Sequence, residues 1–167
     1  MSRSFLLRGL PALLTSVLLA AGCAQAPTAS FDSAQSTTDN FTRAKAAGIR
    51  PVAIGEFTGA EEGQRLAEAR YLRDTLAVEL QGAGLVDASS NAVIAGRVVS
   101  ADFGARDGSV AARFIVTVAG IVAYDRELRT SATWDASADA SRQRGRVYNK
   151  LVGVLLADPG FKNALRR

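Results

Sequence analysis

The chain has 167 residues, 48% of them hydrophobic, and its formal net charge is +4 at pH 7. It contains no histidine and one cysteine, which excludes hydrolases built on a Ser/His or Cys/His pair and a zinc site of Cys and His ligands within one chain. This small charge gives weak support for a nucleic-acid partner, and we expect none. We also expect no metal and no cofactor, and we predict no catalytic residue.

Residues 1 to 22 have the organisation of an export signal. Arg3 and Arg8 make a basic start, and the uncharged run 10–21 that follows is too short to span a bilayer as a permanent helix. The run closes in Leu19-Ala20-Ala21-Gly22-Cys23, which contains the only cysteine. The small residues before this cysteine let a peptidase approach the backbone closely.

This motif resembles the lipobox of bacterial lipoproteins. In that family the Cys thiol receives a diacylglycerol, cleavage frees the Cys amine, and the amine is acylated too. The resemblance therefore implies a lipid anchor, palmitate included, at Cys23, and two or more chains anchor durably at about 0.8 kcal/mol per buried methylene. Because Ala24 follows in place of an inner-membrane Asp, the resemblance implies the outer membrane, with the domain facing the periplasm. The alternative is an ordinary secretory signal and a soluble protein with a free thiol.

Residues 23 to 48 are predicted to be the lipidated Cys and a flexible tether. Ala, Ser, Thr and Gln dominate up to about Asn40, and such a composition buries too little apolar surface to offset its ordering entropy. A short helix over Phe41 to Ala47, ended by Gly48, is expected at its end. We expect one periplasmic domain over residues 49 to 167.

The first half of this domain is predicted to be strand, helix, strand. A strand is expected over Pro51 to Phe57. A helix is expected over Glu61 to Gln81, with one apolar stripe made by Ala69, Leu72, Leu76, Leu80 and Ala83. The run Ala92 to Phe103 is apolar on both faces, which is typical of a central strand.

The second half is predicted to be two strands and a helix. Turns are expected at Arg106 to Gly108 and at Asp125 to Glu127, with alternating apolar residues, Val122 among them, between the turns. The buried face of the last strand is expected to hold Leu128, Thr130, Ala132 and Trp134. A helix over Ser137 to Leu156 follows, broken at Asp158 to Gly160, and the tail is expected to dock through Phe161 and Leu165.

The order β-α-β-β-β-α predicts an α+β fold, a single sheet of about four strands with two helices packed on one face. Together with the lipobox and tether, this order resembles small outer-membrane lipoproteins, the LPS-assembly lipoprotein and the YajG-like lipoproteins. The resemblance covers about residues 49 to 156 and includes Val52-Ala53-Ile54, Leu72-Arg73-Asp74 and Val93-Ile94-Ala95-Gly96-Arg97-Val98. It implies a non-enzymatic envelope assembly or accessory factor that contacts another envelope protein.

Two surfaces are candidates for such contacts. A row of cations on the second helix could hold lipopolysaccharide phosphates or anionic headgroups, although a solvated helix face looks the same: Arg142, Arg146 and Lys150. Tyr71 and Val78 lie seven residues apart on the first helix, away from its apolar stripe, where a partner protein could dock.

The alternative function is a module that binds lipid, lipopolysaccharide or a small ligand on the sheet face opposite the helices. That face is predicted to be polar, which favours protein contact over an apolar pocket, and its residues include Arg113, Thr117, Arg129, Ser131 and Thr133.

Overall fold

The computed structural model describes residues 33 to 59 and 64 to 166. The elements in chain order are α1 (Ser33–Ala46), β1 (Ala53–Gly59), α2 (Gln64–Gly82), β2 (Ala92–Phe103), β3 (Asp107–Val118), β4 (Ile121–Thr133), α3 (Ala140–Ala157) and α4 (Pro159–Ala164). The lipobox-like motif, with Cys23, lies outside the described residues.

The four strands form one mixed sheet in the order β1-β2-β3-β4. β1 and β2 are parallel, with Ile54 opposite Ile94, and α2 connects them because a parallel pair needs a crossover. The pairs β2–β3 and β3–β4 are antiparallel hairpins. The predicted α+β fold with a single four-stranded sheet is therefore confirmed.

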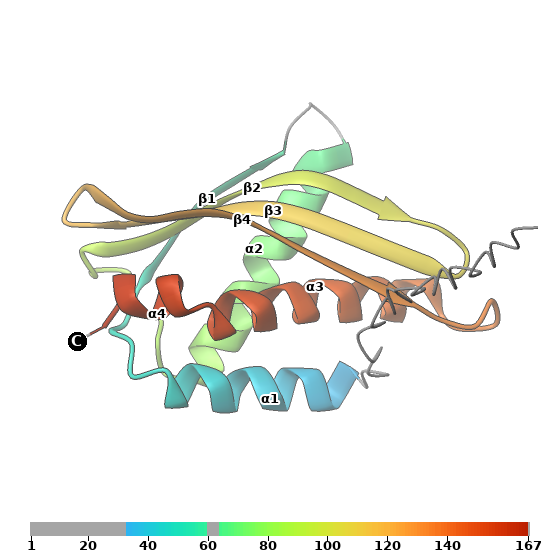
Figure 1. Ribbon diagram of the computed structural model, residues 1–167, viewed down its shortest axis with the longest axis horizontal. Helices are drawn as coiled ribbons and strands as arrows, with labels where there is room; N and C mark the ends of the chain where they lie inside the picture. The colour runs from blue at the N-terminus through green and yellow to red at the C-terminus, as the bar shows by residue number, and fades with distance from the viewer. Residues whose placement is uncertain (1–32, 60–63, 167) are drawn as a thin grey trace, which may run out of the picture.

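Helices α2 and α3 pack on one face of the sheet, and α1 lies on the outer side of these two helices (Figure 1). The main core fills the space between the sheet and α2 and α3. The stripe predicted on α2 is fully buried at Ala69, Leu72, Leu76 and Leu80. From the sheet side, Phe57 and Phe114 meet edge to face with their ring centroids 6.4 Å apart.

The turn between β3 and β4 lies at Ala119-Gly120, and the turn predicted at Asp125 to Glu127 is wrong. Ala119 has φ 51° and Gly120 has φ 81°, the positive values of a two-residue hairpin turn that matches the twist of its strands. Asp125 to Glu127 lie inside β4, where Asp125 accepts hydrogen bonds of 2.5 and 2.6 Å from Arg113 on β3. This cross-strand ion pair holds a charged triplet in the sheet. Val122, the second residue after the turn, is 58% exposed and does not continue the buried alternation predicted for it.

The ordered chain begins earlier than the composition of residues 23 to 48 predicts. Helix α1, 14 residues long, lies inside the predicted tether and packs on α3 and α2. Asn40 and Ala44 are each 1% exposed, and the Asn40 Nδ2 donates to the carbonyl oxygen of Asn149 at 2.8 Å. Gly153 of α3 allows this close approach, because a Cβ there would lie 2.6 Å from the Asn40 Oδ1. A helix that docks through small and hydrogen-bonded residues does not need a strong apolar stripe.

The C-terminal part follows the prediction closely. Asp139 caps α3, and Asp158 ends it and caps α4 by accepting a hydrogen bond from the Phe161 amide at 3.1 Å. Phe161 and Leu165 are fully buried, so the tail docks as predicted. Trp134 is only half-buried: it packs against the core, and its indole nitrogen donates to the Ala105 carbonyl at 3.1 Å. Within the described ranges, no helix is both long enough and apolar enough to cross a membrane.

Candidate functional site

The two predicted partner-contact residues lie together on the surface of α2. Tyr71 is 41% exposed and Val78 is 61% exposed, on the opposite side of the helix from its buried stripe. They line one groove of about 410 Å³ with Asp74, Thr75, Glu79 and, across from α2, Asn149 of α3. The structure therefore brings Tyr71 and Val78 into one site at the junction of α2 and α3.

One wall of this groove contains a buried acid that sequence reasoning missed. Glu79 is 2% exposed, and neither of its carboxyl oxygens has a hydrogen-bond partner among the described residues. Burial raises the pKa of Glu79 to about 8, while the nearby Asn40 amide lowers it in part. At neutral pH this carboxyl is therefore mainly protonated. The sequence did contain a sign of this burial: Glu79 lies beside Leu80 and three residues after Leu76, on the apolar side of the helix.

Beside the groove, a buried network fixes the first turns of α2 to α3. Glu68 accepts hydrogen bonds from the Arg144 Nη2 and from the Tyr148 hydroxyl. Burial and the bond to Glu68 raise the pKa of Tyr148, and the same carboxylate raises the pKa of Arg144. The Arg144 guanidinium lies 5.9 Å from the ring centroid of Tyr71 and 5.4 Å from that of Phe103.

This network also positions the exposed aromatic ring. The rings of Tyr71 and Tyr148 are tilted against each other with centroids 4.9 Å apart. Since Glu68 precedes Leu72 by four residues, its place on the buried stripe was visible in the sequence, but its partners on α3 were not. The result is a Tyr71 side chain that is exposed but packed against Tyr148 and Arg144.

The predicted cationic row lies along α3, where two of its three members are half-buried and have partners within the chain. Arg146 donates to the side-chain oxygen of Gln143 at 2.9 Å, and Lys150 donates to the Ser131 carbonyl on β4 at 2.7 Å. Arg142 is exposed in the first turn of α3. The row therefore lies on the β4 side of α3 and does not join the groove at Tyr71.

Side chains from the helices cover part of both outer strands. Lys150 donates to a carbonyl of β4, the outer strand at one edge of the sheet. At the opposite edge, the Arg73 Nε donates to the Gly55 carbonyl of β1 at 3.3 Å. Each bond opposes the addition of a further strand at that point, because the carbonyl already has a partner.

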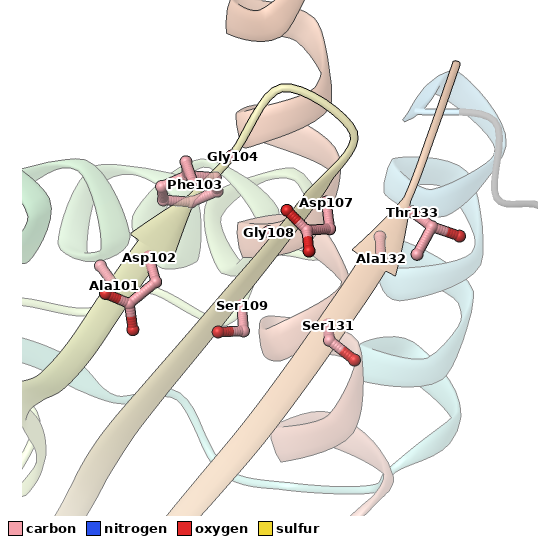
Figure 2. Close-up of a pocket in the computed structure, with 10 residues that line it drawn as sticks. All are labelled: Ala101, Asp102, Phe103, Gly104, Asp107, Gly108, Ser109, Ser131, Ala132 and Thr133. Carbon is pink, nitrogen blue, oxygen red and sulfur yellow. The ribbon is translucent and has the colours of Figure 1, made fainter. Parts of the chain in front are cut away.

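The face of the sheet opposite the helices is open and polar. Asp102, Ser109 and Ser131 stand opposite one another on three strands, and the next row along this face contains Arg129. The short side chains leave a groove of about 580 Å³, bordered by Asp102 and Asp107 (Figure 2), and a second groove of about 310 Å³ adjoins it at Ser109 and Ser131. Hydroxyl and carboxylate groups make this surface suitable for polar ligands.

Further along this open face, Arg113 and Asp125 form an ion pair whose two hydrogen bonds lower the pKa of the Asp125 carboxyl. In the part of the chain that the structure describes, no group of three or more His, Cys, Asp or Glu side chains is arranged to hold a metal ion.

No protein-family model matches this chain, and no curated protein matches it significantly. Among solved structures it is similar to the PelC dodecamer from Paraburkholderia phytofirmans, with 14% identity, 72% of this chain and 90% of that chain covered, and a TM-score of 0.48. A protein from Xanthomonas campestris is 10% identical over 64% of this chain and 79% of that chain, with a TM-score of 0.47. A minor lipoprotein from Acinetobacter baumannii is 14% identical over 66% of this chain and 95% of that chain, with a TM-score of 0.42. Similarity at this level assigns no function.

Proposed function

We propose that the protein is a non-enzymatic bacterial lipoprotein that binds another envelope protein. In this proposal, acyl chains on Cys23 anchor it in the outer membrane, and its domain faces the periplasm as an assembly or accessory factor. The basic, apolar leader and the Leu19 to Cys23 motif support the anchor. Two or more acyl chains give attachment that a single chain does not.

The observation that carries the binding proposal is the groove at Tyr71 and Val78. Exposed apolar side chains within a polar rim are typical of protein interfaces, and an exposed aromatic is enriched at their centres. Tyr71 is also supported by Tyr148 and Arg144, so it loses little conformational freedom when a partner binds. One carbonyl on each outer strand also accepts a hydrogen bond from a helix side chain, which opposes the addition of a strand at those two points.

Affinity purification of the tagged full-length lipoprotein from cell envelopes tests this function. We expect one stoichiometric protein partner, lost in Val78→Asp because a charge then enters the groove. The matched control is Thr133→Asp, an exposed position on the open sheet face, which should retain the partner. Absence of a partner, or equal capture by both variants, would refute the proposal.

A second candidate function is the binding of a small polar ligand, such as the sugar part of lipopolysaccharide, on the open sheet face. The groove bordered by Asp102 and Asp107 favours it, because its volume of about 580 Å³ falls within the usual range for ligand pockets. Ser109→Phe would fill this groove. Mass spectrometry of co-purified material should then show a ligand on the parent that is absent from the variant, and no ligand on the parent would exclude this candidate.

A further inference from the structure

The groove at Tyr71 and Val78 combines apolar and acidic groups in one small space. Val78 and the Tyr71 ring provide apolar surface, and the carboxyl groups of Asp74 and Glu79 lie on either side of Thr75 and Val78 along α2. The Asp74 side chain is 60% exposed at the rim, where Arg73 approaches it at 3.4 Å. Glu79 lies deeper, against α3 and α1.

Glu79 is the unusual member of this set. A buried carboxyl normally has well-aligned hydrogen-bond donors, yet neither oxygen of Glu79 has one among the described residues, although the Asn40 side chain lies near enough to lower its pKa. The adjacent Asn40 Nδ2 donates to the Asn149 carbonyl at 2.8 Å. The Glu79 carboxyl therefore has the capacity for a new partner, and Glu79 already lines the groove.

We propose that this groove binds a lysine or arginine side chain of the protein partner, with the cationic group paired to Glu79 and the aliphatic stem along Tyr71 and Val78. This inference rests on the proposed function and names the chemistry that its contact surface recognises. A long basic side chain fits because it combines an apolar stem with a charged end. Its positive charge would stabilise the ionised form of Glu79, which burial alone disfavours.

The same features argue against an anionic occupant. A lipid phosphate in this groove would lie beside the acidic side chain of Asp74, and like charges repel. A purely apolar side chain would fill the space but leave the Glu79 carboxyl without a partner. The row of Arg142, Arg146 and Lys150 lies on the other side of α3, toward β4, and does not change this balance.

The test uses two peptides that differ only in charge: a short peptide with one central lysine between leucines, and its analogue with norleucine in place of lysine. Binding to the full-length protein in detergent micelles is measured by NMR, with the Glu79 carboxyl carbon as reporter. We expect the lysine peptide to bind at least about tenfold more tightly, a difference of about 1.4 kcal/mol. We also expect the pKa of Glu79 to fall when the peptide binds.

Glu79→Gln keeps the shape of the side chain and removes its ionisation, so it should abolish the difference between the two peptides. Glu127→Gln, exposed on the open sheet face, is the matched control and should preserve it. Equal affinity of the two peptides for the parent, tighter binding of the norleucine peptide, or no binding of either would overturn the inference. Partner capture from envelopes that persists in Glu79→Gln would overturn it too, while leaving the proposed function intact.

Discussion

Replacing Glu79 by glutamine should stabilise the protein in a strongly pH-dependent way. The folded state raises the pKa of this carboxyl from 4.5 to about 8, chiefly through burial. Between these two values the unfolded chain releases the Glu79 proton and the folded chain keeps it. The folded state thus binds more protons, and the free energy of unfolding falls as pH rises through this window.

The size of the effect follows from the shift. One pKa unit corresponds to about 1.36 kcal/mol, so the loss between pH 4 and pH 9 is on the order of 4 kcal/mol. This is a large part of the roughly 5–15 kcal/mol that stabilises a typical domain. A glutamine resembles the protonated acid, and its amide can donate to the Asn40 Oδ1, which has no partner among the described residues.

Urea denaturation at several pH values measures the free energy of unfolding. Fluorescence is a suitable signal, because Trp134 is the only tryptophan of the chain. Near pH 4.5 the parent and Glu79→Gln should unfold with similar free energies, and near pH 8 the variant should be more stable by roughly 4 kcal/mol. Glu127→Gln should show no such divergence. A stability difference between parent and Glu79→Gln that stays constant across this pH range would refute the account of Glu79 as a buried neutral acid.

Three further changes have defined outcomes. Cys23→Ser should leave the chain uncleaved by the lipoprotein peptidase and unlabelled by radioactive palmitate, and unchanged labelling would exclude lipidation at this site. Asp139→Ala should lower the free energy of unfolding by about 1 kcal/mol in urea titration, because the carboxylate caps α3 through the Arg142 amide at 2.7 Å. The last variant has Gln at all three positions of the α3 cationic row, Arg142, Arg146 and Lys150. It should bind anionic vesicles as weakly as the parent at physiological salt, and a salt-sensitive loss of binding in the variant would contradict this prediction.

The fold followed from periodicity, because each core-facing stripe is encoded locally. Leu72, Leu76 and Leu80 recur at helical spacing, and β2 spans Ala92 to Phe103 as its composition predicts. The turn at Ala119-Gly120 was missed because two small residues give a weaker signal than the charged triplet that follows. The pairing of Arg113 with Asp125 across the strands, which the sequence does not reveal, helps to keep that triplet in β4.

Only part of the candidate site could be predicted from the sequence. The exposed positions Tyr71 and Val78 could be read from their place opposite the α2 stripe. The buried acids could not be assigned, because their surroundings come from distant segments: the partners of Glu68 on α3 lie 76 and 80 residues away, and Glu79 is enclosed by α1 as well as α3. A polar helix that docks through Asn40 gives little sign of this in its own sequence.

The central claim is that the α2–α3 groove is the surface through which a lipid-anchored protein binds its protein partner. Photo-crosslinking in living cells tests it directly, with a photoreactive amino acid at position 78 of the full chain and, as control, at position 133 on the open sheet face. We predict that position 78 gives one discrete crosslinked protein and that position 133 does not. No crosslink from position 78, or the same crosslinked protein from both positions, would contradict the claim.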